Sequence, residues 1–147
     1  MGKDERTDRI IGSLRELNKA FFQATRKQIE ENGITHFQYL VMKLLKKYPM
    51  IGLSELAGRM NASPSTVSGA VDRLVQAGLV IRERTEQDRR SLVIRLSPAG
   101  ETLLGRTEAM IMERLSPLLE IPEEEISRML EAHQQIIRIL KKIGGES

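Results

Sequence analysis

Hydrophobic residues in the first part of the chain recur at alternating spacings of four and three, the period of a helix with one apolar face. They are Ile10, Leu14, Leu17, Phe21 and Ala24. The pattern predicts a helix over about residues 5–31, ended by Asn32 and by Gly33, which suits a left-handed cap. Such a helix is roughly 40 Å long. So small a chain cannot bury it alone, so the pattern also predicts a partner chain.

Three shorter helices are marked by their start signals. The pattern Thr-x-x-Gln at the beginning of residues 35–48 is a capping box. Gly52 and Glu55 give a weaker start signal for a short helix over residues 53–60. Ser63 is a good N-cap and Pro64 stands at the first helical position, where its missing N–H is tolerated. This helix is expected to end at 77–78.

Two strands are predicted next, over 79–84 and 92–96, joined by a charged loop. The second alternates cleanly, so that Val93 and Arg95 are expected on the face away from Leu92. The two strands form a hairpin. Residues 50–51 are a candidate for a third, very short strand.

The C-terminal part is predicted to hold two more helices. Ser97-Pro98 repeats the cap-then-proline signal and opens a helix through about residue 116. Pro117 and Pro122 bracket a break, after which three glutamates favour a helix start through the helix dipole. The last helix again carries an apolar stripe spaced four and three. Its members are Ile126, Leu130, His133, Ile137 and Leu140. The two terminal stripes predict symmetric dimerisation, and the alternative is packing of the two helices on each other within one chain.

Composition narrows the class of protein. The chain has 147 residues, of which 40% are hydrophobic, so it suits one domain or one domain with helical extensions. The absence of cysteine excludes disulfides and thiolate zinc sites. No apolar run approaches the roughly 20 residues of a membrane span, and the N-terminus lacks the apolar core of a signal peptide. We therefore expect a soluble cytoplasmic protein without a membrane partner.

Charge is unevenly distributed. Residues 1–48 hold ten Lys/Arg and six Asp/Glu, and residues 49–100 hold seven and five. Residues 101–147 hold six and nine, so this third is acidic while the rest is basic. The asymmetry is typical of a protein with one surface facing a polyanion, although many other proteins share it.

Helix, turn, helix and hairpin follow in an order that fits a double-helical groove. The 64–77 helix has an apolar stripe, and its other face holds small hydroxyls, Gly69 and Arg73, which suit entry into a major groove. The hairpin tip is Asp88-Arg89-Arg90, in which a carboxylate can orient a guanidinium toward a minor groove. Arginines on the strands, Arg82, Arg84 and Arg95, can meet phosphates. The alternatives are an ordinary amphipathic helix and a solvated hairpin tip.

Six short motifs together resemble the MarR (multiple antibiotic resistance regulator) family. They are Leu53-Ser54-Glu55-Leu56-Ala57, Ser65-Thr66-Val67-Ser68, Val71-Asp72-Arg73-Leu74, Gly78-Leu79-Val80, Asp88-Arg89-Arg90 and Leu96-Ser97-Pro98-Ala99-Gly100. The resemblance implies a mainly α protein with a small β-hairpin wing (α+β), a winged helix–turn–helix flanked by dimerisation helices. Residues 5–48 would provide dimerisation and support. Residues 49–100 would form the DNA-binding lobe, with the helix–turn–helix over about 53–77 and the wing over 79–96. Residues 101–143 would complete the dimer.

The resemblance also implies function: a homodimer that reads a palindromic operator in double-stranded DNA and represses transcription until a small lipophilic or aromatic acid binds. The candidate DNA-binding residues are Ser63, Ser65, Thr66, Ser68, Arg73, Arg84, Asp88, Arg89 and Arg90. Arg90 would enter the minor groove with Asp88 as its orienting partner. The candidate effector-binding residues are Phe22, His36 and Tyr39. Packing of these three side chains in the core or on the surface is the alternative.

No other chemistry stands out in the sequence. The only histidines, His36 and His133, are far apart, so no metal site is expected. Glycine-rich phosphate loops and hydrolase motifs are absent, so we expect neither a cofactor nor an enzyme. Two rival functions remain: a DNA-binding regulator without a ligand switch, and a protein-interaction module that kept the fold. Asp72 on the outer helix face and Glu86 in the wing favour the second rival.

Overall fold

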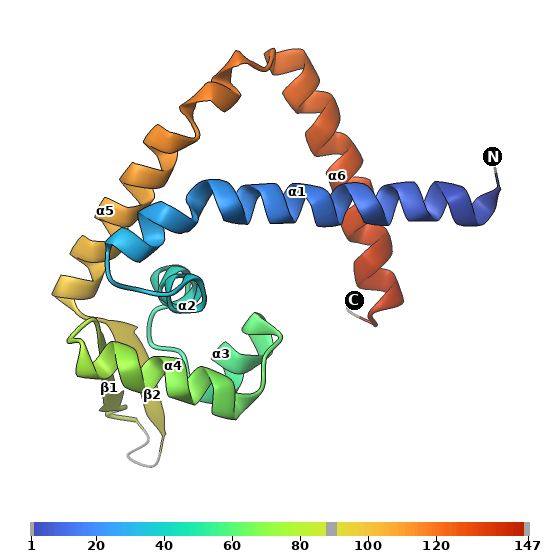
Figure 1. Cartoon of the computed structure of the whole chain (residues 1–147). Coiled ribbons are helices and arrows are strands. Elements are labelled where there is room, and N and C mark those ends of the chain that lie inside the picture. Colours follow the sequence, from blue (N-terminus) through green and yellow to red (C-terminus); the bar gives the residue numbers. More distant parts are fainter. Residues whose placement is uncertain (1, 88–90, 146–147) are drawn as a thin grey trace. The chain divides into compact units, whose positions relative to one another are not determined.

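The computed structural model describes residues 2–87 and 91–145 (Figure 1). Its described elements are α1 (Lys3–Glu31), α2 (His36–Lys47), α3 (Leu53–Met60), α4 (Pro64–Gln76), β1 (Val80–Arg84), β2 (Leu92–Leu96), α5 (Pro98–Arg114), the 3-10 helix η1 (Ser116–Glu120) and α6 (Glu123–Ile143). They form two compact units that divide between Arg114 and Leu115. The mainly helical fold with one antiparallel hairpin confirms the predicted class. No helix within the described ranges combines the length and apolar character needed to cross a membrane.

Helix α2 lies at the centre of the first unit and contacts α1, α3, α4, α5 and β2. Its Val41, Met42 and Leu45 are almost fully buried. The other large apolar side chains that are almost fully buried are Ile29, Leu56, Val67, Val71, Leu74 and Leu104. Burial of these aliphatic side chains is the main force that holds the helices of this unit together.

Local signals in the sequence place the helix ends correctly. The Thr35 side chain accepts a hydrogen bond from the backbone N–H of Gln38 at 3.1 Å, and the Gln38 side chain accepts from the N–H of Thr35 at 3.0 Å. The Ser63 hydroxyl accepts from the N–H of Thr66 at 3.2 Å, which confirms the predicted cap. Gly33 follows α1 with φ of 77°, the left-handed conformation that the sequence predicted.

The hairpin pairs Val80 with Leu96 at its base and Arg84 with Leu92 at its outer end. The predicted third strand is reduced to one bridge, in which the N–H of Ile94 donates to the carbonyl of Ile51 at 2.8 Å.

Burial on the two faces of β2 differs from the sequence-based expectation. Val93 is only 8% exposed, whereas Leu92 is 48% exposed. Strand β2 contacts α2, α3 and α5, so both of its faces are covered near the core. Leu92 lies at the end of the strand farthest from the base of the hairpin and escapes this cover.

A close contact joins the start of α5 to the turn after α4. The Ser97 hydroxyl donates to the carbonyl of Gly78 at 2.6 Å and accepts from the N–H of Gly100 at 3.0 Å. The backbone N–H of Ser97 donates to the carbonyl of Leu79 at 3.0 Å. A Cβ on Gly100 would lie 2.0 Å from the Leu79 oxygen, so only glycine fits. This contact explains the Leu-Ser-x-x-Gly motif.

We predict that Gly100→Ala lowers the free energy of unfolding by about 2–3 kcal/mol, because the added methyl group must push backbone apart. Gly105→Ala in the same helix is the matched control, since nothing lies within 4 Å of its added carbon. It should be stabilising by about 1 kcal/mol, the difference in helix propensity. Urea denaturation at one fixed protein concentration measures both variants. Equal effects of the two substitutions would contradict the close contact.

Candidate nucleic-acid interface and ligand pocket

Helix α4 buries one face and exposes the other. Val67, Val71 and Leu74 are buried against the core, as the apolar stripe predicted. The outer face is made of Ser65, Thr66, Gly69, Asp72, Arg73 and Gln76, which are exposed, with Ser68 half-buried. This exposed face is lined with small polar side chains over its first two turns.

The first turn of α4 carries a network of hydroxyl groups. The Ser63 oxygen lies 2.7 Å from the Thr66 hydroxyl and 3.2 Å from the Ser65 hydroxyl. The same oxygen accepts the Thr66 backbone N–H. The capping serine therefore holds its two neighbours in place, and the predicted DNA-binding residues at this helix start lie together.

A groove of about 370 Å³ runs between this face and the start of α2. Its lining residues are Thr35, Phe37, Gln38, Ser65, Thr66, Gly69, Ala70 and Arg73. None of them is acidic, and Arg73 contributes a positive charge. The α2 residues were not among the sequence-based candidates, because their proximity to α4 depends on tertiary packing. A groove with donors, one cation and no carboxylate suits an anion.

Two of the hairpin arginines form ion pairs with carboxylates. Arg82 of β1 forms an ion pair with Asp72 of α4. Arg95 of β2 pairs with Glu83 of β1, with Nε and Oε1 2.8 Å apart. Both guanidinium groups already hold carboxylates, so contact of Arg82 and Arg95 with phosphates stays a prediction that would compete with these pairs.

Of the remaining candidate DNA-binding residues in the wing, only Arg84 is among the described residues. Arg84 is exposed at the outer end of β1, opposite Leu92. Asp88, Arg89 and Arg90 lie outside the described residues.

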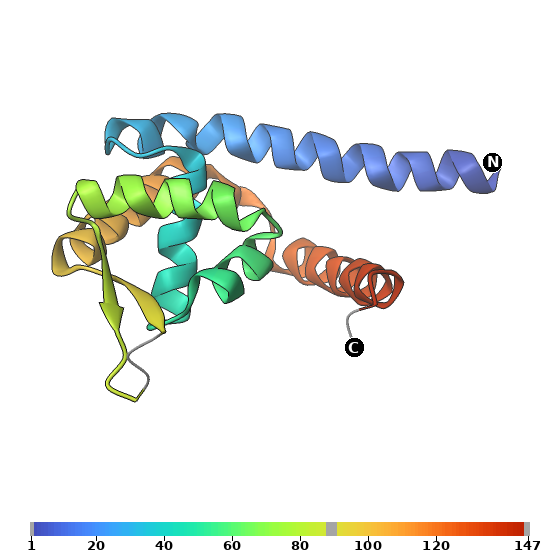
Figure 2. The same cartoon turned by 90° about the horizontal axis from the view of Figure 1, so that it is seen from below.

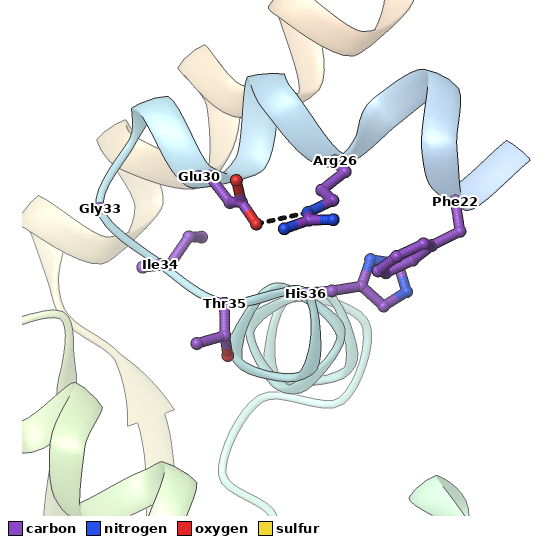
Figure 3. A pocket seen from close by; sticks show the side chains of 7 residues that line it. All are labelled: Phe22, Arg26, Glu30, Gly33, Ile34, Thr35 and His36. Atoms are coloured by element: carbon purple, nitrogen blue, oxygen red, sulfur yellow. Dashed lines mark hydrogen bonds and ion pairs between the residues drawn. The ribbon is translucent and has the colours of Figure 1, made fainter.

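A second hollow, which we call the ligand pocket, lies between the C-terminal half of α1 and the start of α2 (Figure 3). It has a volume of about 270 Å³. Its lining residues are Phe22, Arg26, Glu30, Gly33, Ile34, Thr35 and His36. This volume is slightly below the roughly 300 Å³ at which sites for drug-sized ligands begin, so the pocket suits a small molecule.

Two predicted effector residues meet in the ligand pocket. The rings of Phe22 and His36 are in edge-to-face contact, with centroids 4.7 Å apart. Burial lowers the pKa of His36, which keeps its imidazole neutral near pH 7. Its Nδ1 atom is buried without a hydrogen-bond partner among the residues described. Tyr39 is buried, with its ring centroid 6.4 Å from that of His36, and does not line the pocket.

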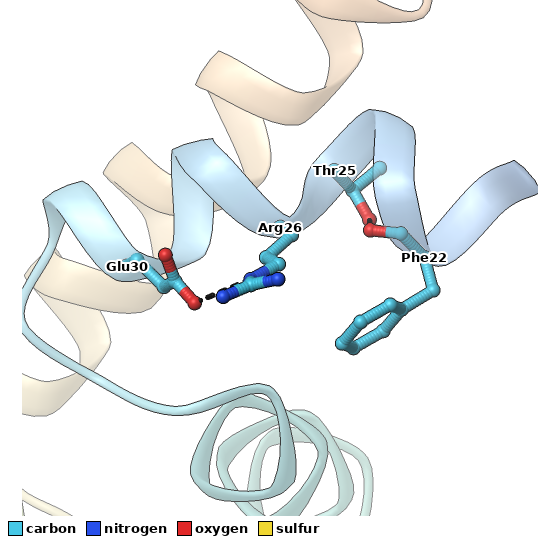
Figure 4. Close-up of polar contacts among 4 residues, drawn as sticks. All are labelled: Phe22, Thr25, Arg26 and Glu30. Carbon is cyan, nitrogen blue, oxygen red and sulfur yellow. Dashed lines mark hydrogen bonds and ion pairs between the residues drawn. The ribbon is translucent and has the colours of Figure 1, made fainter. Parts of the chain in front are cut away.

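The charged residues of the ligand pocket were missed by the sequence analysis. Arg26 Nε donates to Glu30 Oε1 at 2.7 Å on the pocket side of α1 (Figure 4). The hydrogen bond and the charge of Glu30 raise the pKa of the Arg26 guanidinium above its ordinary value. Phe22, Arg26 and Glu30 are spaced by four residues each, so helical periodicity is the signal that would have found them.

No group of three or more His, Cys, Asp or Glu side chains that could hold a metal ion occurs within residues 2–87 and 91–145. The chemistry available at both sites is therefore that of hydrogen bonds, ion pairs and aromatic contacts among the described residues.

The order α2, α3, α4, β1 and β2 defines a winged helix–turn–helix, with α4 in the place of the recognition helix. Comparison with known proteins agrees. The model of the MarR family matches residues 34–92. The HTH-type transcriptional repressor MdtR of Bacillus subtilis is 33% identical over 122 residues, which cover 77% of this chain and 78% of that protein. This chain belongs to the MarR family.

Solved structures share the fold. CouR from Rhodococcus jostii, bound to p-coumaroyl-CoA, is 26% identical, with a TM-score of 0.74 over 88% of this chain and 92% of that one. Staphylococcus aureus MarR, in complex with salicylate and kanamycin, has a TM-score of 0.84 over 94% of both chains, but only 18% identity. The second likeness shows the fold alone.

We predict that the protein loses stability between about pH 7.5 and about pH 5.5, in part through His36. Burial lowers the folded-state pKa of this group below its ordinary 6.5, so the unfolded chain binds the proton more strongly. The stabilising contribution is complete above pH 6.5 and is lost as pH falls through the folded-state pKa. In His36→Gln the loss on acidification should be smaller, as urea denaturation at both pH values would show. Equal losses in wild type and in His36→Gln would contradict the assignment.

Proposed function

We propose that this protein is a homodimeric transcriptional regulator that binds a palindromic DNA operator and represses transcription until a small acid binds. The observation that carries this proposal is the exposed face of α4, with its hydroxyls, Gly69 and Arg73, beside a hairpin on the same compact unit. A regulator of this kind acts where the DNA is, in the cytoplasm, and needs no catalytic role.

In this proposal α4 enters the major groove with its first two turns. That groove is about 12 Å wide and admits a helix whose outer side chains are small. Ser65, Thr66 and Ser68 have hydroxyls that can donate to or accept from base edges. Arg73 stands two turns from the helix start and reaches a phosphate or a guanine. Ser63 supports the reading residues through its hydroxyl network.

The wing would contact the flanking DNA. Arg84 is exposed on the hairpin and would meet the sugar–phosphate backbone. For Asp88, Arg89 and Arg90 the proposal rests on the sequence, in which a carboxylate two residues before an arginine suits minor-groove reading. Binding should weaken steeply with salt, because every neutralised phosphate releases counterions.

Dimerisation is supported by apolar side chains that each unit leaves uncovered. In the first unit, Leu17 of α1 is 55% exposed, and Ile10 and Phe21 are exposed beside it in the helical pattern. In the second unit, α6 has no buried residue, and Leu140 is 54% exposed. A two-fold dimer would cover both helices and set two recognition helices about 34–36 Å apart, one turn of DNA.

The ligand pocket is the proposed effector site. Phe22 and His36 offer aromatic contacts. Arg26 would bind a ligand carboxylate by exchanging its present partner Glu30 for it. The p-coumaroyl-CoA bound to CouR supports an effector with an aromatic acyl group. A screen of small aromatic carboxylic acids for loss of DNA binding separates this proposal from a regulator without a ligand switch.

The rival role as a protein-interaction module loses part of its support. Asp72, which favoured it, is paired with Arg82 of the hairpin. Selection from a random pool of DNA duplexes decides between the two. Enrichment of a palindrome supports the regulator, and failure to enrich any sequence favours the interaction module.

We predict that Gly69→Ala stabilises the fold by about 0.5–1 kcal/mol and weakens operator binding about tenfold or more. The added methyl group meets no protein atom within 4 Å but stands on the face proposed to enter the groove. Gly58→Ala in α3 is the matched control, since its added carbon is equally free. It should stabilise the fold and leave binding unchanged. Gel-shift titration of both variants measures the difference, and unchanged affinity of Gly69→Ala would count against α4 as the reading helix.

We predict that Leu17→Glu raises the dissociation constant of the dimer about 100-fold or more. Each copy would lose the burial of one leucine, about 1.5–3 kcal/mol, and would bury a charge instead. Asn18→Glu is the control, because it places the same charge on an exposed neighbouring position of α1. Light scattering over a dilution series measures the mass. A Leu17→Glu protein that remains as dimeric as wild type would show that this face does not form the interface.

A further inference from the structure

One ion pair joins the recognition helix to the wing. Asp72 projects from the outer face of α4, and Arg82 projects from β1 toward it. The side chains are 51% and 37% exposed, so neither is held in place by burial. A surface pair of this kind contributes little to stability, but it links α4 to β1.

The ion pair connects two elements that leave the same turn in different directions. Helix α4 and strand β1 diverge from the turn at Ala77–Leu79 (Figure 2), where Gly78 has a φ of 75°. The turn is fixed by the Ser97 hydrogen bonds, and the base of the hairpin packs on α2, α3 and α5. The outer end of the hairpin, where Leu92 is 48% exposed, lies beyond this cover. Asp72 lies about one helical turn before the end of α4, and Arg82 lies two residues beyond Val80, the base of the strand. Their ion pair therefore connects α4 to β1 at a distance from the turn that joins them.

A second pair stiffens the hairpin itself. Arg95 and Glu83 face each other diagonally across the two strands, and Arg95 donates to both oxygens of the carboxylate, at 2.8 and 3.5 Å. Glu83 is thereby occupied by Arg95, and Arg82 is paired with Asp72 instead. The two pairs together connect α4 to β1 and β1 to β2.

We propose that Asp72 and Arg82 are positioning residues for DNA, whose ion pair sets the angle between the recognition helix and the wing. The inference rests on the proposed DNA-binding function. With the angle set, α4 and the hairpin reach their separate grooves at the same time, and neither Asp72 nor Arg82 has to touch DNA.

Charge alone predicts the opposite behaviour. Asp72 is an acidic residue beside Arg73 on the face proposed to meet DNA, so removing its charge should strengthen binding to a polyanion. A positioning role predicts that Asp72→Asn weakens binding, and only to DNA long enough for the wing to engage. The two explanations therefore differ in sign.

The binding test uses the operator selected by the wild-type protein, as a long duplex with flanking DNA and as a short duplex without it. Asp72→Asn and Arg82→Gln should each weaken binding to the long duplex about threefold to fivefold, and the double variant should lose no more than either single one. Binding to the short duplex should be unchanged. Glu86→Gln is the control, because it removes one carboxylate from the wing loop and should leave affinity equal or higher. Tighter binding by Asp72→Asn would overturn the proposal in favour of a charge effect alone. A salt slope reduced by about one in Arg82→Gln alone would overturn it in favour of a direct phosphate contact.

A second measurement needs no DNA. Because the chain has no cysteine, Ser65→Cys and Gln87→Cys give two unique spin-label sites, one on α4 and one in the wing loop. With labelled protein diluted into unlabelled protein, wild type should give one narrow distance distribution, and Asp72→Asn a broad one. Identical distributions would overturn the positioning role. If the wild type instead selects no DNA, the proposed function fails, but the distance measurement still tests whether the Asp72–Arg82 ion pair fixes the angle between α4 and the wing.

Discussion

The contact of Gly100 with the Leu79 carbonyl is the constraint on which the rest of the first unit depends. At this point the end of the recognition helix, the beginning of the wing and the beginning of α5 meet within a few residues. Ser97 fastens all three with hydrogen bonds to Gly78, Leu79 and Gly100. The carbon that a larger residue would add has no space. The end of α4 and the start of α5 are therefore joined directly, through hydrogen bonds and a backbone contact that leaves no space between them.

Much of the fold could be predicted from sequence because its signals are local. The capping box at Thr35, the Ser63-Pro64 start and the left-handed Gly33 each depend on atoms within four residues. The second strand was predicted to the residue by its alternation. The burial of Val93 was not, since it depends on helices far away in the sequence that cover the second face of β2. Periodicity shows which residues share a face and leaves open what covers that face.

The candidate site was predictable in composition but not in pairing. The sequence shows that the hairpin carries several arginines, but it does not show that Arg82 and Arg95 form ion pairs with Asp72 and Glu83. An ion pair between a helix and a strand has no sequence signature of its own, because the spacing of its partners is set by the turn between them. The pair of Arg26 and Glu30 was overlooked for a different reason: its signal was present, in the helical spacing from Phe22, but two opposite charges at that spacing are common on solvated helices.

The first turn of α2 relates the two sites to each other. Thr35 lines both the ligand pocket and the groove beside α4, and its side chain caps the helix that carries His36 and Phe37. His36 faces the pocket, and Phe37 lines the groove. A ligand that shifts the backbone at His36 would therefore either break the capping box or move Phe37 as well. The two hydrogen bonds of the capping box satisfy the backbone N–H groups of Thr35 and Gln38. Moving the turn as one body therefore costs less free energy than breaking these bonds. In the proposed regulator, a shift of this single capped turn would couple a bound acid to the face of α4 without a long pathway.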